Sequence, residues 1–484
     1  MTSSYGLRLE LSKLHLHKSI AVSHSLNHSL VTTSAAIHDP QLNSQSESEI
    51  NRTPSDHPKY AVYKAIANKL EKCPSIRQLN QLHALLIRTH FLVESYHVSF
   101  YYNSIIRSYT RTNAPRQAVQ VYLSMSRAGV PPDSFTLPIT LKAICQFYSI
   151  QTGLQLHTVM IHHGLEGDEY CESGLISMYC KVGDFGSAYK LFDGNSKRKL
   201  GSWNAIIGSL SQSRRAKAAV LMFVRMKRSG FRPDDVTMVS IMTACGNLGD
   251  LNLGLQLHKC VFQARNSMKD DVLMLNSLID MYGKCGRMDL AHGVFSGMDL
   301  KNVSSWTSMI VGYASNGYVR DAVECFRGMR EACVMPNHVT FVGVLSACVH
   351  GGMVEEGKHY FQMMKCVYGI EPRIQHFGCM VDLLGRMGLL EEAIIMVEGM
   401  PMKANVVIWG CLMGACERYS DVKMGERVAA HLIELEPWNE GVYVVLSNIY
   451  ANRNMWTEVG NIREVMKQGR LAKIPGYSLA TIPD

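Results

Sequence analysis

Residues 303–337 read VSSWTSMIVGYASNGYVRDAVECFRGMREACVMPN, and two other stretches can be laid over them without a gap. These are residues 200–234, LGSWNAIIGSLSQSRRAKAAVLMFVRMKRSGFRPD, and residues 99–133, SFYYNSIIRSYTRTNAPRQAVQVYLSMSRAGVPPD. All three have alanine at the twentieth place, methionine at the twenty-seventh, and Pro-Asp or Pro-Asn at the end. A period of roughly 20 to 50 residues is typical of solenoids, in which each unit buries its apolar face against its neighbours.

Two further kinds of unit lie between these segments, and a small residue marks the same place in each of them. It is glycine in one kind, at Gly153, Gly254 and Gly357, and alanine in the other, at Ala188, Ala291 and Ala393. In most alanine-marked units an aromatic residue follows four positions later, which is the spacing of one helical face. Each unit is therefore predicted to be a helical hairpin. Close approach of two helices explains the small residue, and a proline ends the second helix of the 35-residue units.

The amino-acid composition argues against several classes of function. The 484 residues are 47% hydrophobic and 19% charged, and contain no apolar run of the about 18 residues that a membrane span needs, so no membrane role is expected. A net charge of +8 allows an anionic partner without requiring one. The fourteen cysteines are scattered, and no two lie three positions apart, which argues against zinc-ribbon and redox motifs and favours reduced, buried thiols. Neither a metal nor a cofactor is predicted.

Residues 1–55 differ in composition from the rest of the chain. They are rich in Ser, Thr and His, and contain only Glu10 as an acidic residue before Asp39. Organellar transit peptides are basic, Ser-rich and poor in acids, so this stretch is predicted to be one, with a disordered tail as the alternative.

Two groups of residues resemble a phosphate-binding loop and a metal site, but the repeat explains both groups better. Gly352 to Lys358 has the glycine and lysine spacing of a phosphate-binding loop, but His359 stands where Ser or Thr would hold magnesium, and Gly357 belongs to the small-residue series. His157 and His258 occupy equivalent places in successive units. Equivalent places are offset along a solenoid, so these histidines are interpreted as repeated structural residues and not as a metal site.

The alternation of three unit types resembles the pentatricopeptide repeat family, specifically the plant subfamily in which P, L and S units alternate. The resemblance implies an all-α fold, a right-handed superhelical α-solenoid of helix-turn-helix repeats. Nine repeats are expected over residues 99–405: P 99–133, L 134–168, S 169–199, P 200–234, L 235–271, S 272–302, P 303–337, L 338–373 and S 374–405. A degenerate L-like repeat is expected before them, over residues 63–98.

The pattern changes after Asn405. Residues 406–473, which include Val407-Ile408-Trp409-Gly410 and Glu434-Leu435-Glu436-Pro437-Trp438-Asn439, resemble the two tetratricopeptide-like E motifs that follow such arrays in RNA-editing factors. A short tail, 474–484, completes the sequence. Its Pro475-Gly476-Tyr477-Ser478-Leu479 departs from the Pro-Gly-Cys-Ser-Trp that usually opens the family's next element, so the DYW deaminase domain is expected to be absent.

The chemistry of deamination leads to the same expectation. A zinc deaminase needs His-x-Glu, which supplies a ligand and the general acid/base, and a Cys-x-x-Cys pair that completes the zinc site. None of the nineteen histidines has glutamate two residues later, and no cysteine pair has the required spacing. The chain is therefore predicted not to be an enzyme, and a separate DYW-type deaminase with other editing-complex proteins is expected to supply catalysis.

The resemblance also implies which residues read RNA. In this family the residue at the fifth place of a unit and the last residue of that unit approach one base together. The array offers Asn103 with Asp133, Asn204 with Asp234, Asn276 with Asn302, and Thr307 with Asn337. The alternative is helix capping, since Asn, Asp and Thr are favoured at helix starts whatever the function. Pro138, Val239 and Val342 fill the fifth place of the L units, and Ser173 with Lys199 is assigned no base.

The edge chemistry of the bases, with the family's pairing as a guide, gives a sequence preference. Uracil and guanine present an imino N–H that a carboxylate accepts, whereas cytosine and adenine present an acceptor nitrogen that suits an amide. The array is expected to prefer U-N-N-U-N-Y-A-N-N, written from the RNA 5′ end, just upstream of the edited cytidine.

The functional prediction is a sequence-specific single-stranded RNA-binding protein that selects a site for C-to-U editing in organellar transcripts, in the mitochondrion or alternatively the chloroplast. Two other functions fit the same repeats. One is an organellar RNA-stability, splicing or translation factor, and the other is a protein-binding helical-repeat scaffold.

Overall fold

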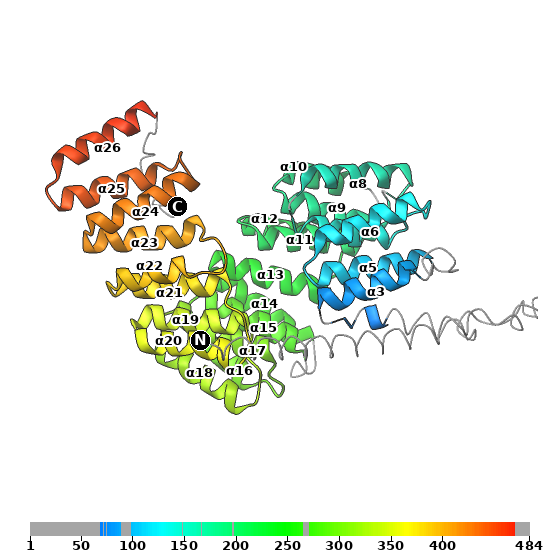
Figure 1. Ribbon diagram of the computed structural model, residues 1–484. Coiled ribbons are helices and arrows are strands. Elements are labelled where there is room, and N and C mark those ends of the chain that lie inside the picture. The colour runs from blue at the N-terminus through cyan, green and yellow to red at the C-terminus, as the bar shows by residue number, and fades with distance from the viewer. Residues whose placement is uncertain are drawn as a thin grey trace, which may run out of the picture. The chain divides into compact units, whose positions relative to one another are not determined.

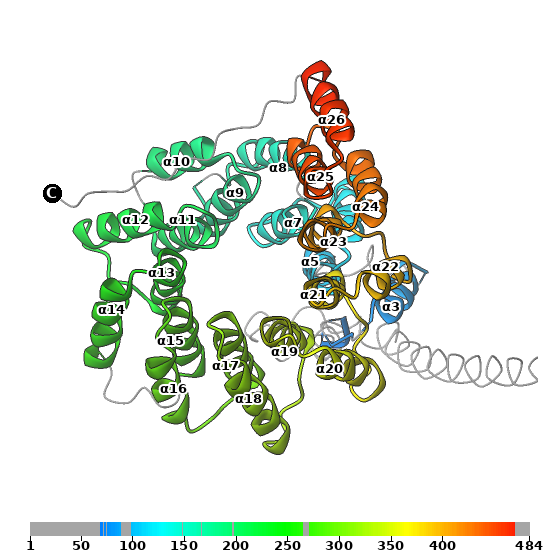
Figure 2. The same cartoon turned by 90° about the vertical axis from the view of Figure 1, so that its left-hand side faces the viewer.

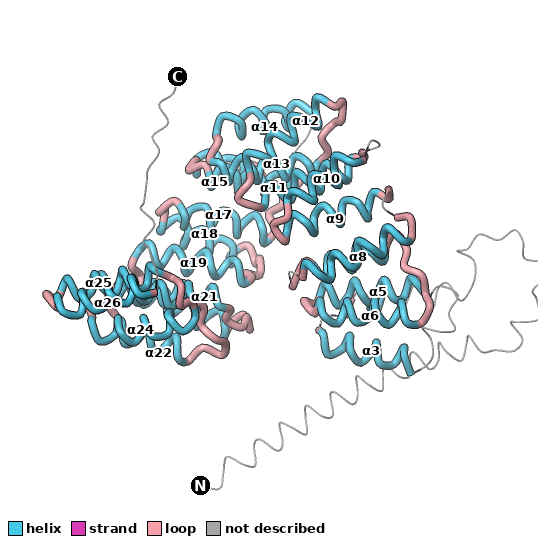
Figure 3. Tube along the Cα trace, turned by 90° about the horizontal axis from the view of Figure 1, so that it is seen from above, coloured by secondary structure: helices cyan, strands magenta, loops and turns pink. Residues whose placement is uncertain are grey.

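A computed structural model describes residues 68–70, 72–73, 75–88, 98–147, 149–165, 167–195, 198–264 and 271–469. The predicted transit peptide, the tail 474–484 and part of the degenerate repeat lie outside the described residues. The described residues form helices and no strand, which confirms the all-α solenoid (Figures 1 and 3). The chain divides into an N-terminal unit that ends at Ser209 and a C-terminal unit that begins at Leu210, and the division falls inside one helix.

From α5 (Val98–Arg111) onward, odd-numbered helices are the first and even-numbered helices the second of each hairpin, whereas α3 (Ile76–Arg88) takes the place of a second helix before α5. The N-terminal unit contains α3, α5, α6 (Pro115–Arg127), α7 (Thr136–Ile144), α8 (Ile150–His162), α9 (Glu169–Lys181) and α10 (Phe185–Gly194). The division falls in α11 (Leu200–Gln212), and the C-terminal unit continues with α12 (Ala216–Arg228), α13 (Asp235–Leu248), α14 (Leu251–Ala264), α15 (Val272–Lys284), α16 (Met288–Ser296), α17 (Val303–Ser315), α18 (Val319–Glu331), α19 (His338–Gly351), α20 (Val354–Cys366), α21 (Ile374–Arg386), α22 (Leu390–Glu398), α23 (Val406–Tyr419), α24 (Val422–Leu435), α25 (Glu440–Asn452) and α26 (Trp456–Gln468).

Within the C-terminal unit the hairpins stack so that first helices contact first helices. The row α13, α15, α17, α19, α21, α23 and α25 is continuous (Figure 2). Each second helix from α14 to α24 packs against the first helix of its own hairpin and the first helix of the next. In the N-terminal unit α5, α7 and α9 form the same kind of row. The first helices therefore present one surface and the second helices another.

The residues that mark the repeat form the core of each hairpin. Ala219 and Met226 of α12, and Ala322 and Met329 of α18, are fully buried. The aromatic residue four positions after each alanine is buried as well, as Phe326 shows. Removing apolar surface from water contributes about 25 cal/mol per Å², so this repeated stripe is what holds each hairpin closed.

The glycine-marked units use their small residue to bring neighbouring hairpins together. A Cβ atom on Gly254 would lie 2.6 Å from Sδ of Met281, and one on Gly153 would lie 2.8 Å from Sδ of Met178. In both cases the second helix of one hairpin meets the first helix of the next. Gly357 has the same role against Leu383, and Gly352 ends α19 with φ of +64°, so the stretch that resembles a phosphate-binding loop is a helix-turn-helix junction.

The repeated histidines join consecutive hairpins. Nδ1 of His157 lies 2.8 Å from the hydroxyl of Tyr179, and His258 bonds the hydroxyl of Tyr282 in the same way. Burial lowers the pKa of His258, which favours the neutral ring. Among the described residues no three His, Cys, Asp or Glu side chains gather in a way that could hold a metal ion. In that part of the chain, too, every helix is too short or too polar to cross a bilayer.

Candidate RNA interface

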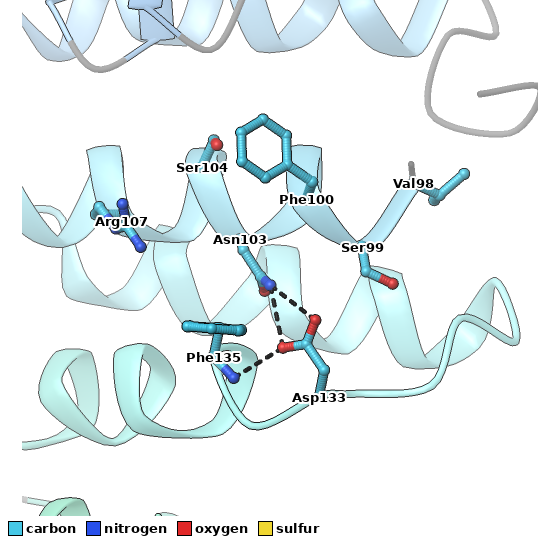
Figure 4. Close-up of a pocket in the computed structure, with 8 residues that line it drawn as sticks. All are labelled: Val98, Ser99, Phe100, Asn103, Ser104, Arg107, Asp133 and Phe135. Atoms are coloured by element: carbon cyan, nitrogen blue, oxygen red, sulfur yellow. Dashed lines mark hydrogen bonds between the residues drawn. The ribbon is translucent and has the colours of Figure 1, made fainter. Parts of the chain in front are cut away.

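The first predicted pair, Asn103 with Asp133, forms a hydrogen-bonded unit in the structure (Figure 4). Nδ2 of Asn103 lies 3.2 Å from each carboxylate oxygen of Asp133. Because a carboxylate can only accept, this contact fixes which end of the amide faces it. The pair lines a cavity of about 470 Å³, together with Phe100, Phe135 and Arg107.

The two oxygens of Asp133 have different surroundings. Oδ1 accepts from the backbone N–H groups of Phe135 and Thr136, at 2.9 and 2.7 Å, and so caps α7. Oδ2 accepts only from Asn103 among the described residues. Burial raises the pKa of Asp133, but the hydrogen bonds from Thr136, Phe135 and Asn103 outweigh it, so the pKa is lowered and the group stays ionised at neutral pH. Oδ2 therefore keeps the capacity to accept another N–H.

Asn276 and Asn302 repeat this arrangement in the C-terminal unit with an amide in place of the carboxylate. Oδ1 of Asn302 caps α17 by accepting from the backbone N–H of Ser305 at 3.0 Å. The same Oδ1 accepts from Nδ2 of Asn276 at 3.2 Å. The other atom of the amide, Nδ2 of Asn302, makes no hydrogen bond to a described residue. This pair thus presents a donor where Asp133 presents an acceptor.

Thr307 and Asn337 are joined through a third residue. The hydroxyl of Thr307 lies 2.7 Å from the hydroxyl of Thr340, which donates in turn to Oδ1 of Asn337 at 3.1 Å. Oδ1 of Asn337 also caps α19 through the N–H of Val339, at 2.9 Å. Nδ2 of Asn337 has no partner in the described part of the chain, so it is a donor like that of Asn302.

The remaining predicted pair is divided between the two units. Asn204 lies on α11 in the N-terminal unit and is half-buried. Asp234 belongs to the C-terminal unit, where its Oδ1 caps α13 by accepting from the N–H of Thr237 at 2.8 Å. Its cap matches that of Asp133, and its pairing with Asn204 stays a prediction.

The unit 169–199, to which no base is assigned, has a different local structure. Its last residue, Lys199, cannot cap the following helix and instead lies 3.7 Å from Glu169. Glu169 takes over the cap by accepting from the N–H of Gly201 at 3.0 Å. Ser173 bonds the carbonyl of Tyr170, so this unit lacks a paired fifth and last residue.

A row of exposed apolar residues beside the paired ones was not predicted from the sequence. In each case the residue is the second of its unit: Phe100, Phe135, Tyr170, Val236, Leu273, Val339 and Val407. The rings of Phe135 and Tyr170 are stacked, with centroids 6.3 Å apart and planes 29° from parallel. Figure 4 shows Phe100 and Phe135 on opposite sides of Asn103. Each residue of the row lies three positions before the fifth residue of its unit, and this constant spacing could have identified the row in the sequence.

A second cavity of about 470 Å³ lies among α19, α21 and α23. Gly378, the fifth residue of the unit 374–405, lines it, and a Cβ built there would meet nothing within 4 Å. Oδ1 of Asn405 caps α23 through the N–H of Ile408, at 3.1 Å. The last predicted repeat thus has the terminal amide, but its fifth residue has no side chain that could pair with it.

Basic residues recur at the end of the first helices. The last turn contains Arg111 in α5, Lys142 in α7, Lys181 in α9, Lys284 in α15, Arg386 in α21 and Arg418 in α23. Cations at this end stabilise a helix through its dipole, so their position has a structural reason. Two of them are paired within their own helix: Lys284 lies 2.8 Å from Asp280, and Arg386 lies 2.9 Å from Asp382.

Comparison with known families finds repeats over most of the array. The PPR repeat family matches residues 98–146, 198–247 and 301–350, and the PPR repeat matches 173–194, 273–303, 339–367 and 376–403. The E motif matches residues 419–481.

Two relatives from Arabidopsis thaliana align along nearly the whole chain. Pentatricopeptide repeat-containing protein At1g77170, mitochondrial, is 52% identical over 97% of this chain and 98% of its own. Pentatricopeptide repeat-containing protein At1g59720, chloroplastic/mitochondrial, is 36% identical over 95% of this chain and 77% of its own. Among solved structures, the pentatricopeptide repeat protein PPR10 in complex with an 18-nt psaJ RNA element superposes with a TM-score of 0.53 at 16% identity, over 86% of this chain and 65% of that one. That likeness concerns the fold.

Proposed function

The chain belongs to the pentatricopeptide repeat family, and from that membership we propose that it binds single-stranded RNA in a sequence-specific manner and selects a cytidine for conversion to uridine in an organellar transcript. In this proposal the RNA lies along the first helices, and the fifth and last residues of the three P units and of the S unit 272–302 read its bases.

The observation that carries this proposal is that the two polar atoms at the end of each terminal side chain have different hydrogen-bond partners. Asp133, Asn302 and Asn337 use Oδ1 to cap the next helix. The remaining atom is an acceptor in Asp133 and a donor in both asparagines. An acceptor suits the imino N–H of uracil, and a donor suits the ring nitrogen of cytosine or adenine. Capping and reading are therefore compatible, because they use different atoms.

The exposed apolar residues support base binding by a second route. Bases stack on aromatic side chains, at about 1–3 kcal/mol per base, whatever their identity. Phe100 and Phe135 lie on either side of Asn103, so a base that reaches this amide is placed between two rings. Helical-repeat proteins read single strands at about one base per repeat in this way. PPR10, which has a similar fold, was solved in complex with an 18-nt RNA element, and this supports RNA as the proposed ligand.

The editing role rests on the E motif match and on the chemistry that the sequence does not contain. The 484 residues include neither the His-x-Glu nor the Cys-x-x-Cys of a zinc deaminase. The protein is accordingly proposed to be a specificity factor and not an enzyme, with a DYW-type deaminase acting in trans. The names of the two relatives described above place one in mitochondria and the other in chloroplasts and mitochondria, and we propose the mitochondrion for this chain.

Sequencing of organellar RNA tests the proposal. A plant without this protein is expected to leave one or a few cytidines unedited, each preceded by a match to U-N-N-U-N-Y-A-N-N. Altered transcript ends or splicing with complete editing would instead indicate an RNA-stability or splicing factor. Purified protein that deaminates cytidine by itself would contradict the role of a partner enzyme.

A further inference from the structure

The second helix of the unit 200–234 is surrounded by positive charge. Residues 213–232 contain seven basic residues and no acidic one: Arg214, Arg215, Lys217, Arg225, Lys227, Arg228 and Arg232. All seven are exposed, and we call them the α12 basic surface. Exposed Leu221 lies among them, with 70% of its surface accessible.

Equivalent stretches of the other two P units show that the fold does not need this charge. Residues 316–335 contain three basic and three acidic residues, and residues 112–131 contain two basic residues and no acid. All three second helices bury the same alanine and methionine, so their packing is alike. The charge of α12 is a property of one hairpin and not of the repeat.

Helix stability does not explain the α12 basic surface either. Lys227 and Arg228 at the end of α12 interact favourably with the helix dipole. Arg214 and Lys217 lie at its start, where a positive charge is unfavourable. Ion pairing does not compensate: among the described residues Arg214, Lys217, Lys227 and Arg228 have no acidic partner, whereas Arg327 of α18 lies 3.0 Å from Glu324.

We propose that the α12 basic surface binds the phosphate backbone of the same RNA, outside the nucleotides that the first helices read. This rests on the proposed function. Phosphate contacts require positive charge and no base-specific geometry, which matches a surface of arginine and lysine without a pocket. Once the read segment is bound, the adjoining RNA is held at high effective concentration beside the protein, so a weak electrostatic contact adds to the total affinity.

The position of the surface separates it from the reading residues. The paired residues and the exposed apolar row belong to the first helices and the turns that precede them, whereas α12 is a second helix that packs on α13. Its buried residues Ala219, Phe223 and Met226 face the core, and its charged residues face away from it. An RNA that contains only the read nucleotides is therefore not expected to reach it.

The test combines two RNAs with two variants of the full chain. One RNA contains the nine read nucleotides, and the other extends them on both sides with unrelated sequence. The first variant is Lys217→Gln with Lys227→Gln and Arg228→Gln. The matched control, Arg320→Gln with Arg327→Gln and Arg330→Gln, removes the same charge from the equivalent helix α18. All six residues are exposed, so both variants are expected to fold.

The readout is the slope of log affinity against log salt. For single strands each phosphate contact contributes about 0.7 to this slope, so the α12 variant is expected to lower it by about two on the extended RNA. The slope on the short RNA is expected to stay unchanged, as are both slopes of the control.

The inference would be overturned if the α12 variant lowered the salt slope equally on both RNAs. It would also be overturned if both variants lowered the slope on the extended RNA equally. An unchanged slope on the extended RNA would overturn it too, and would assign the surface to another partner such as an acidic protein. A wild-type protein that binds neither RNA would instead refute the proposed function.

Discussion

At Asp133, Asn302 and Asn337, helix capping and the proposed base reading involve different atoms of one side chain. In each of them Oδ1 accepts backbone N–H groups at the start of the next helix. An Asn-to-Asp exchange preserves this cap, because both residues are good caps. The exchange replaces the second atom, a donor, by an acceptor. If these residues only cap helices, such an exchange should leave the RNA preference unchanged. If they also read bases, it should change which base is preferred at that position.

The Asn337→Asp variant tests this separation. It is expected to shift the seventh letter of the preferred RNA from A to G, because the new carboxylate oxygen accepts the imino N–H of guanine. The change should amount to about 1–3 kcal/mol, as for a good base-edge contact in other readers. Competition binding with RNAs varied only at that letter measures it, and a preference for A that survives the exchange would refute the pairing of Thr307 with Asn337.

The places of the paired residues were predictable because they recur in register, whereas the exposed apolar row was not predicted. Phe100, Phe135 and Leu273 are apolar residues in the first turn of a helix or next to it, and a single sequence gives no measure of their burial. The usual expectation is that such residues are in the core. The cap by Glu169 in place of Lys199 was also missed, because it depends on the contact between Glu169 and Gly201, which are 32 positions apart.

At the scale of helices, contacts between successive first helices set how closely the hairpins stack. In α21 a Cβ on Gly385 would lie 2.9 Å from Cβ of Ala415 in α23. Neither atom can move by a change of rotamer, so the helices themselves would have to separate. Gly378, in the same helix, has open space around it.

These two glycines are expected to respond in opposite directions to the same substitution. Gly385→Ala should lower the free energy of unfolding by about 1–3 kcal/mol through overpacking. Gly378→Ala should raise it by about 0.5–1 kcal/mol, because alanine restricts the unfolded chain and fits the helix. Urea unfolding of both variants measures the difference. Equal effects of the two substitutions would show that the stacking distance between α21 and α23 is not what the structure indicates.

The E motif region displays two large exposed residues, Trp438 before α25 and Trp456 at the start of α26, with 69% and 64% of their surfaces accessible. Tryptophan is enriched among residues that dominate protein interfaces, where truncation costs about 2 kcal/mol or more. If this region recruits the deaminase, Trp438→Ala with Trp456→Ala should reduce editing in the plant and leave RNA affinity unchanged.

A matched control for that variant is Leu300→Ala with Met335→Ala, which removes two equally exposed apolar residues outside the E motifs. It should leave editing intact. Editing that persists in the tryptophan variant, at normal protein levels, would argue against this surface as the contact with the enzyme.

At the scale of the whole molecule, the sequence predicted the alternation of hairpins because each unit repeats the same alanine, methionine and glycine contacts with its neighbours. A solenoid is stabilised by such neighbour contacts, so the local pattern is enough to specify it. The division within α11 was not predictable, since the unit 200–234 follows the same register as its equivalents. The charge of the α12 basic surface is visible in the sequence, but its exposure is not, and neither is the lack of an acidic partner for Lys217, Lys227 and Arg228 among the described residues.

The central claim is that the order of paired residues along the chain determines the order of bases in the bound RNA. Selection from a pool of random single-stranded RNA with the purified protein tests this claim most directly. The account predicts enrichment of U at the first and fourth letters, a pyrimidine at the sixth and A at the seventh, with no preference at the five letters between and after them. Enrichment of a motif with different spacing, or a bound pool without sequence preference, would contradict it.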